Sequence, residues 1–257
     1  MTSTDELKRI AGREKVGVGV IEKDHAITVA LLTISKTEFS DLMVFKGGTA
    51  IKKMFYPKTR FSEDLDFNCE RDIAKELGSQ IERPLIENSH GVTFTGVHRE
   101  ESRSKEGRRL RLEYKDSNGY PNSIRLDLAF REKPIMKPKK MKVKNLYLIR
   151  NITITTMNIE EIAAEKVRAL MVTRKPRHLY DVWFLLRKQI RPSKELLDEK
   201  LKLYDEEFDV DKLGRVVKEV EADWQTDLQA LVPQVPEFSN VKRHVARALA
   251  LGSATIT

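Results

Sequence analysis

The segment Asp64-Leu65-Asp66-Phe67 alternates between acidic and apolar side chains. Successive side chains of a β-strand point to opposite faces, so in a strand both aspartates project from one face and the apolar pair from the other. Two carboxylates this close repel each other unless a cation or a proton intervenes. The pattern therefore predicts a strand with one buried and one acidic face. The alternative is an ordinary solvent-exposed strand edge.

The glycine pair Gly47-Gly48 precedes this strand. The apolar run of residues 42–45 predicts a buried strand that enters a tight turn, and Thr49 is a candidate N-cap for a helix through about Phe55. Glycine lets a backbone approach a ligand closely, and a helix N-terminus offers free N–H groups, so this turn suits phosphate. Tight strand-to-helix packing is the alternative reason for two glycines. No Gly-Lys-Ser/Thr follows, which excludes a P-loop.

A third carboxylate, Asp127, belongs to a predicted hairpin. Residues 108–115 and 123–130 read as strands around the turn-prone stretch 116–119. Leu126 and Leu128 share one face of the second strand, which leaves Asp127 on the other. Hard divalent cations prefer oxygen ligands and bridge to phosphate, and three carboxylates can hold two of them. Asp64, Asp66 and Asp127 are therefore candidate ligands of Mg²⁺ or Mn²⁺.

Other elements of the N-terminal part follow from periodicity and breakers. Apolar residues at helical spacing predict a helix over residues 22–38. Another helix is expected over residues 72–88, interrupted or ended near Pro84. The Pro- and Lys-rich residues 131–145 predict a surface loop or irregular hairpin, followed by a short strand at residues 146–149.

The C-terminal part has a helical pattern. Asn158 followed by Glu161 predicts a capping box for a helix to about Thr173, and Lys175-Pro176 separates it from a helix over residues 177–188. Further helices are expected over residues 193–204, 211–231 and 241–251. We expect an N-terminal α/β lobe of residues 1–150 and a helical lobe of residues 151–257, with the boundary within about ten residues.

Several basic side chains are candidate contacts for an anionic ligand. Arg60 and Ser62 lie between the glycine turn and the aspartates, where the planar guanidinium can neutralise phosphate or else pair with a neighbouring carboxylate. Lys46 and Lys52 are weaker candidates, because lysines are common at surfaces. These residues leave a phosphate-binding and a purely structural interpretation open.

Lys166 and Asp181 form a third cluster, in the predicted helical lobe. Lys166 lies beside an apolar stripe, where it can snorkel harmlessly or face a cleft and bind a triphosphate. Asp181 lies in an otherwise apolar stretch and needs a partner. Lys166 or Arg168 can be that partner in a structural ion pair, so both interpretations stay open here.

Composition limits the classes of protein that remain. The 257 residues have a net charge of +8, which favours an anionic partner such as nucleic acid or nucleotide. No apolar run is long enough to cross a bilayer, no signal peptide is visible, and the single Cys69 excludes an intramolecular disulfide framework, so we expect a cytoplasmic protein. Histidine spacing does not suggest zinc, and no Gly-x-Ser-x-Gly elbow is present.

The combined motifs resemble the AbiEii/AbiGii-type toxin nucleotidyltransferases of the DNA polymerase beta-like superfamily. The resemblance rests on Phe45-Lys46-Gly47-Gly48-Thr49-Ala50 and Arg60-Phe61-Ser62-Glu63-Asp64-Leu65-Asp66-Phe67. It continues through residues 159–170 and 175–182 and covers about residues 20–190. It implies an α+β fold, with a nucleotidyltransferase-type mixed sheet, flanking helices and a C-terminal helical lobe that completes an active-site cleft.

The resemblance also implies roles for individual residues. Asp64 and Asp66 would bind metal, Gly48 and Thr49 would line the nucleotide phosphates, and Gly47, Arg60 and Ser62 join them as candidate NTP contacts. Lys166 would contact the triphosphate, Asp181 would complete the catalytic set, and Asp127 fits the third carboxylate.

The implied activity is metal-dependent transfer of NMP from an NTP to RNA, with the 3′ acceptor end of tRNA as the leading acceptor. The implied setting is a toxin–antitoxin or phage-defence system with a cognate antitoxin. Two alternatives remain, namely transfer to a protein or small molecule and a catalytically inactive module that binds RNA or a partner.

Overall fold

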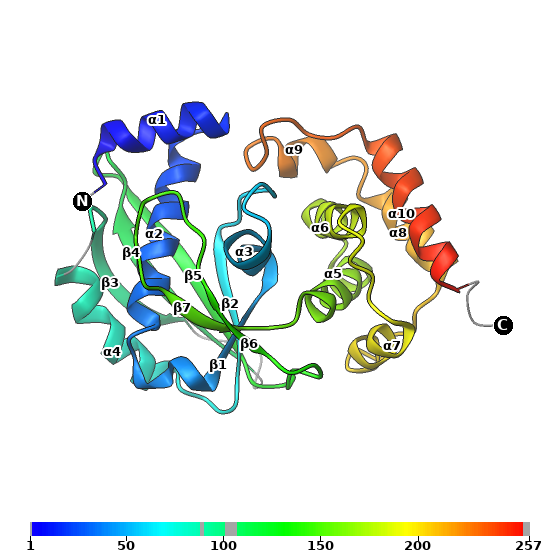
Figure 1. Ribbon diagram of the computed structural model, residues 1–257, viewed down its shortest axis with the longest axis horizontal. Coiled ribbons are helices and arrows are strands. Elements are labelled where there is room, and N and C mark those ends of the chain that lie inside the picture. Colours follow the sequence, from blue (N-terminus) through cyan, green and yellow to red (C-terminus); the bar gives the residue numbers. More distant parts are fainter. Residues whose placement is uncertain (1, 88–89, 101–106, 254–257) are drawn as a thin grey trace. The chain divides into compact units, whose positions relative to one another are not determined.

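The computed structural model describes residues 2–87, 90–100 and 107–253 of the chain (Figure 1). These residues form two compact units, Met1–Met157 and Asn158–Thr257. The first unit contains a sheet with helices, and the second contains helices.

The sheet of the first unit has seven strands in the order β3-β4-β5-β2-β1-β7-β6. Its strands are β1 (Met43–Lys46), β2 (Asp64–Cys69), β3 (Thr93–Glu100), β4 (Gly107–Lys115), β5 (Pro121–Ala129), β6 (Lys139–Lys142) and β7 (Thr153–Thr156). β2 pairs antiparallel with β1 and parallel with β5, while β4 and β5 form an antiparallel hairpin. The sheet is therefore mixed, and the predicted α+β class is confirmed.

The helical elements of this unit are α1 (Thr4–Glu14), α2 (Val18–Ile34), η1 (Glu38–Leu42), α3 (Gly47–Ala50), η2 (Ile51–Phe55) and α4 (Ala74–Glu87). α4 packs on β3 and β4, and α2 packs on β5. The apolar side chains of β2 and β5, such as Leu65, Phe67 and Leu126, are buried beneath them. One face of the sheet thus forms the core, and the other carries the polar residues.

Several predicted boundaries shift. α2 starts and ends four residues before the predicted range, because residues 18–21 extend its first turn and Ser35 ends it. Pro84 lies inside α4 without ending it. Asn88, the last residue of that predicted helix, lies outside the described residues. The helix after the glycine turn reaches Phe55 as expected, but it begins at Gly47, so Thr49 is not its N-cap.

The predicted strand at residues 146–149 is wrong. The segment is irregular, with Leu148 in a left-handed conformation at φ 57°, and the strand in this region is β7. Tyr147 in this segment is instead buried, and its hydroxyl donates a hydrogen bond to Asp24 Oδ2 at 2.8 Å. The expected loop of residues 131–145 also contains the short strand β6.

The helix α1 and the strand β3 also had no counterpart in the sequence prediction. α1 buries Leu7, Ile10 and Ala11, and the hydroxyl of Ser3 accepts a hydrogen bond from the Glu6 amide at its start. β3 pairs antiparallel with β4 through a register shift near Gly96. A strand of mixed polarity at a sheet edge has weak alternation, so its pairing partner determines it more than its own pattern.

The second unit consists of α5 (Ile159–Thr173), α6 (Pro176–Arg187), α7 (Lys194–Lys202), α8 (Val210–Glu219), α9 (Trp224–Leu228) and α10 (Phe238–Ser253). Asn158 caps α5 by accepting from the Glu160 amide. Glu161 does not complete the predicted capping box, because its carboxylate is buried and pairs with Lys200 at 2.7 Å. The long helix predicted over residues 211–231 is divided into α8 and α9.

A buried polar cluster ties α2 to η2 and to the segment containing Tyr147. Lys53 Nζ donates to Asp24 Oδ2 at 2.7 Å and to Thr28 Oγ1 at 2.9 Å. Lys53 and Asp24 are almost fully buried, and the ring of His25 lies 4.5 Å from that of Tyr147. A buried ion pair with further hydrogen bonds holds its side chains in one arrangement. This cluster therefore holds η2, which follows the glycine turn in the chain, against α2.

We predict that His25 makes the fold sensitive to acid. Burial, together with the nearby Lys53, lowers the pKa of His25 to about 4. The unfolded chain therefore binds the proton more readily between pH 6.5 and pH 4, and stability falls as the pH falls through this window. The loss between pH 7 and pH 5 should be about 2 kcal/mol. Urea unfolding at both pH values measures it.

His25→Phe, which keeps a ring beside Tyr147, is the matched variant for this prediction. It should remove most of the loss between pH 7 and pH 5, because phenylalanine does not titrate. An acid loss in His25→Phe equal to that of the unmodified chain would show that other groups cause it.

None of the described helices is long and apolar enough to span a bilayer.

Candidate active site

The polar face of β2 carries the two predicted aspartates. Asp64 and Asp66 are partly exposed, whereas Leu65 between them is fully buried. In the parallel pairing with β5, Asp64 lies opposite Arg125 and Asp66 lies opposite Asp127. Side chains opposite each other in register share a face, so Asp127 joins the two aspartates on one side of the sheet.

The glycine turn lies directly against Asp66. Gly47 has φ +79°, and a Cβ added to it would lie 2.2 Å from Asp66 Oδ2. A Cβ on Gly48 would lie 2.8 Å from Arg60 Nη2 and 3.0 Å from Ser62 Oγ. Both glycines are therefore needed because side chains of the candidate site occupy the space that a Cβ would fill. Within the first unit, the structure brings the turn, Arg60, Ser62 and the aspartates together.

We predict that Gly47→Ala damages both the turn and Asp66. The new Cβ collides with the carboxylate, and alanine is strained at this positive φ. We expect a loss of stability of about 1–3 kcal/mol in urea unfolding, together with a loss of catalytic activity.

Gly12→Ala is the control, since a Cβ there meets no atom within 4 Å. It should not lower stability, because alanine favours a helix interior over glycine. Full activity of Gly47→Ala would show that Asp66 tolerates displacement and would contradict the close-approach interpretation.

Thr49 and Arg60 make contacts that hold the turn in place. The Thr49 hydroxyl is buried and donates to the backbone carbonyl of Asp64. Arg60 is 3% exposed, and its Nη1 donates to the Phe61 carbonyl at 3.0 Å. Both residues thus connect the segments around β2. These contacts are all within the protein and stabilise the turn itself.

Lys52 points into the protein. Its Nζ donates to the carbonyls of Pro57 at 2.7 Å and Thr59 at 3.1 Å, and it lies 3.7 Å from the centre of the Phe61 ring. Burial lowers the pKa of Lys52 to about 8. These contacts argue against the phosphate contact considered for Lys52. Lys46, by contrast, lies opposite Asp66 in the β1–β2 register.

Two arginines that the sequence prediction missed hold the outer aspartates. Arg125 donates to Asp64 through Nε and Nη2, both at 2.8 Å. Arg109 donates to Asp127 through Nε at 2.7 Å and Nη2 at 3.2 Å. The hydrogen bond that Arg109 donates to Asp127 raises the pKa of Arg109, and the one that Arg125 donates to Asp64 raises the pKa of Arg125. A signal existed, because the predicted hairpin places both arginines on the face of Asp127.

The carboxylates supply suitable chemistry for a hard divalent cation. Three aspartates on one sheet face offer only oxygen ligands, which Mg²⁺ and Mn²⁺ prefer. In the part of the chain that the structure describes, no three acidic, histidine or cysteine side chains lie close enough together to hold a metal ion. Asp64 and Asp127 are directed to their arginines instead. The chemistry of the donor set, three carboxylates on one sheet face, fits a divalent cation.

The remaining predicted residues pair with each other in the second unit. Lys166 Nζ lies 2.9 Å from Asp181 Oδ2, and the two side chains are 9% and 1% exposed. Lys166, one of the two ion-pair partners considered for Asp181, thus forms this pair. Next to them, Lys200 is fully buried and pairs with Glu161 and Glu165. Sequence reasoning missed this cluster, since nothing in its pattern separates Lys200 from a surface lysine.

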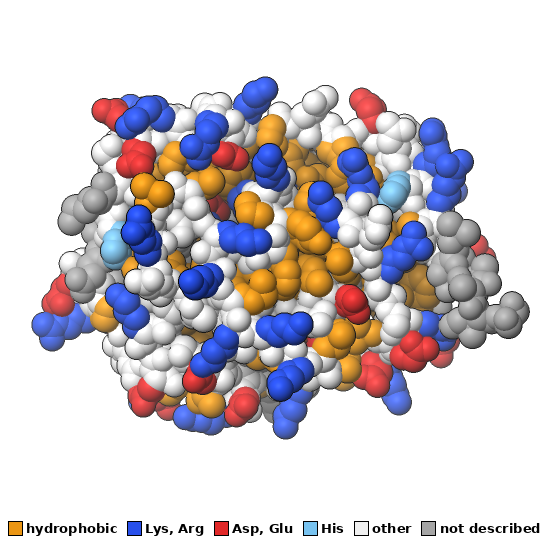
Figure 2. Space-filling view, viewed as in Figure 1, with side chains coloured by type: hydrophobic (Ala, Val, Ile, Leu, Met, Phe, Trp, Pro, Cys, Tyr) orange, Lys and Arg blue, Asp and Glu red, His pale blue; other side chains and the backbone are white. Residues whose placement is uncertain are grey.

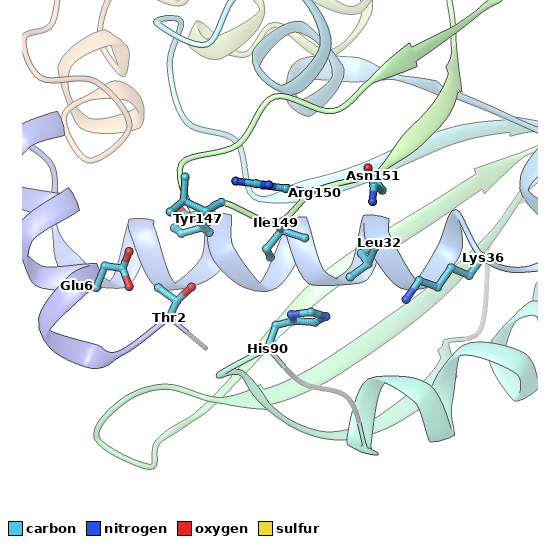
Figure 3. A pocket seen from close by; sticks show the side chains of 10 residues that line it. Thr2, Glu6, Leu32, Lys36, His90, Tyr147, Ile149, Arg150 and Asn151 are labelled. Atoms are coloured by element: carbon cyan, nitrogen blue, oxygen red, sulfur yellow. The ribbon is translucent and has the colours of Figure 1, made fainter.

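A separate cavity of about 580 Å³ lies on the side of α2 (Figure 3). Its lining includes Glu6, Lys36, His90 and Arg150, with Leu32 and Ile149 between them. None of the predicted site residues lines it. The candidate active site is therefore defined by the carboxylates and the glycine turn and not by this cavity.

The fold is similar to that of solved structures, one of them a nucleotidyltransferase toxin. MenT4, a nucleotidyltransferase toxin from Mycobacterium tuberculosis, matches with a TM-score of 0.70 at 18% identity, over 98% of this chain and 90% of its own. JHP933 from Helicobacter pylori matches with a TM-score of 0.61 at 19% identity, over 92% and 93% of the two chains. No curated protein matches the sequence. These structural matches show that the fold is shared.

The family follows from the sequence match. The model of the family described as nucleotidyl transferase AbiEii toxin, type IV TA system, matches residues 29–250. The chain belongs to this family of toxin nucleotidyltransferases, and the resemblance identified from its motifs is confirmed.

Proposed function

We propose that this enzyme transfers NMP from an NTP to RNA in a reaction that depends on Mg²⁺ or Mn²⁺, and that its acceptor is the 3′ end of tRNA. The observation that carries the proposal is the close packing of the glycine turn on Asp66, with Asp64 and Asp127 on the same sheet face. Backbone N–H groups at such a turn can bind the phosphates of an NTP. The adjacent carboxylates can bind a divalent ion that neutralises part of the triphosphate charge.

Each residue then has a role in the proposed reaction. Asp64, Asp66 and Asp127 would hold the divalent ion, which supplies charge neutralisation at the triphosphate and activation of the acceptor hydroxyl. Gly47 and Gly48 leave room for the phosphates. The acceptor oxygen forms a bond to the α-phosphorus, the bond from that phosphorus to the oxygen bridging to the β-phosphate breaks, and pyrophosphate leaves.

Lys166 and Asp181 are proposed to serve the same reaction from the second unit. The ammonium of Lys166 would contact the triphosphate, and Asp181 would hold it in position through the 2.9 Å ion pair. An ammonium group has three N–H donors, so a lysine that pairs with one carboxylate can also contact phosphate oxygens.

RNA as the acceptor is supported by charge. The net charge of +8 favours a polyanion, and Lys and Arg side chains are spread over the face shown in Figure 2. A cognate antitoxin is proposed from the family to which the chain belongs.

The test uses each of the four α-labelled NTPs with purified tRNA, total RNA, protein and small metabolites, in the presence of Mg²⁺ or Mn²⁺. We expect label on tRNA, no label without the divalent ion, and no label with Asp64→Ala. Label found only in protein or metabolites would contradict the RNA acceptor. Undiminished activity of Asp64→Ala would contradict the proposed site.

A further inference from the structure

The polar face of the sheet carries basic side chains beside the proposed metal ligands. In one cross-strand row Asp66 lies between Lys46 and Asp127, and Arg109 lies beyond Asp127. In the next row Arg125 lies opposite Asp64. Arg111 of β4 lies opposite Arg125 in this second row. Each of the three aspartates thus has a basic residue opposite it in a neighbouring strand.

The two arginine pairs have a geometry that a passing surface contact lacks. Arg125 donates hydrogen bonds to both carboxylate oxygens of Asp64 at 2.8 Å. Arg109 donates to both oxygens of Asp127 at 2.7 and 3.2 Å. Bidentate pairs of this kind are stronger and more directional than a single charged hydrogen bond. Arginine also stays protonated under all ordinary conditions, so this positive charge is permanent.

A divalent ion that binds Asp64 or Asp127 must therefore approach a guanidinium within a few ångströms. A free ion meets repulsion from Arg125 and Arg109 and competes with them for the same oxygens. A divalent ion already bound to a triphosphate arrives as a complex with net negative charge, and for that complex the arginines are attractive. The same two side chains thus oppose one form of the metal and favour the other.

We propose that Arg109 and Arg125 are specificity-determining residues that make the site accept its divalent ion as a complex with nucleoside triphosphate and not as the free ion. The inference rests on the proposed metal-dependent function. The two arginines lie outside the family motifs, and they would oppose metal binding to the carboxylates until nucleotide is present.

The experiment measures Mn²⁺ binding to the whole chain by electron paramagnetic resonance of the unbound ion. The variants are Arg109→Gln, Arg125→Gln and the double variant, each checked for an unchanged melting temperature. Without nucleotide, the double variant should bind Mn²⁺ at least about tenfold more tightly than the unmodified chain. With a non-hydrolysable NTP analogue, the order should reverse, because the variant has lost two cations that attract the complex.

Two controls separate charge from general effects. Arg125→Lys keeps the charge but loses the planar fork, so it should retain weak binding of free Mn²⁺. Arg83→Gln changes an exposed arginine of α4 in the same unit, which pairs with Glu87 at 2.7 Å, and it should behave as the unmodified chain.

The possible outcomes are distinct. Free Mn²⁺ binding that is unchanged or weakened in the double variant would overturn the inference and leave the arginines as structural ties between strands. If the unmodified chain shows no Asp64-dependent binding of Mn²⁺ even with the NTP analogue, the proposed function itself fails.

Discussion

Asp66→Asn is expected to lower the rate of nucleotidyl transfer by about three orders of magnitude or more while the chain stays folded. The substitution keeps the volume of the side chain and removes its charge. Asp66 has the central position on the polar face, since it lies opposite both Lys46 and Asp127 and against Gly47. Loss of this charge removes one of the three proposed metal ligands.

The measurement is single-turnover transfer from labelled NTP at saturating Mg²⁺. Asp41→Asn is the matched control, because Asp41 is a surface aspartate of the same unit, with a side chain that is 68% exposed and paired with Lys140. It should retain full activity. More than about a tenth of the original rate in Asp66→Asn would amount to a loss below 1.4 kcal/mol and would exclude a direct metal-binding role.

Lys200→Met is expected to cost about 3–5 kcal/mol of folding stability. The Lys200 side chain is fully buried, and its ammonium lies 2.7 Å from Glu161 and 3.1 Å from Glu165. Methionine replaces the volume but leaves two buried carboxylates without their cation. The substitution therefore leaves buried negative charge between α7 and α5 that the ammonium no longer neutralises.

Urea unfolding measures this effect. Lys202→Met changes an exposed lysine of the same helix and should alter stability by less than about 0.5 kcal/mol. Adding Glu161→Gln and Glu165→Gln to Lys200→Met should recover much of the loss, because the buried charges are then removed together. A cost below about 1 kcal/mol for Lys200→Met alone would indicate that water reaches the glutamates.

Local patterns were sufficient for the elements nearest the site. Alternation over residues 64–67 identified β2, and the turn at residues 116–119 identified the β4–β5 hairpin. Asn158 correctly marked the start of α5. In each case the information lies within a few consecutive residues, where side-chain period and turn chemistry act directly.

The errors arose where contacts between segments that are distant in the sequence determine the local structure. The run at residues 146–149 has strand composition, yet Tyr147 turns inward to meet Asp24 of α2, and the backbone cannot stay extended. Glu161 suits a capping box, but the buried Lys200 of α7 binds it instead. A local rule fails here because a buried charge gains more from a partner than a helix start gains from a cap.

The sequence alone determined the family, the glycine turn and the same-face placement of Asp64 and Asp66, because a motif and a two-residue period need no tertiary information. Only the tertiary structure decided that Gly47 must lack a Cβ to clear Asp66, that Lys52 is buried, and that Arg109 and Arg125 grip the outer aspartates. These facts depend on register between strands and on packing between segments. Both are set by the whole sheet, and no single stretch of sequence encodes them.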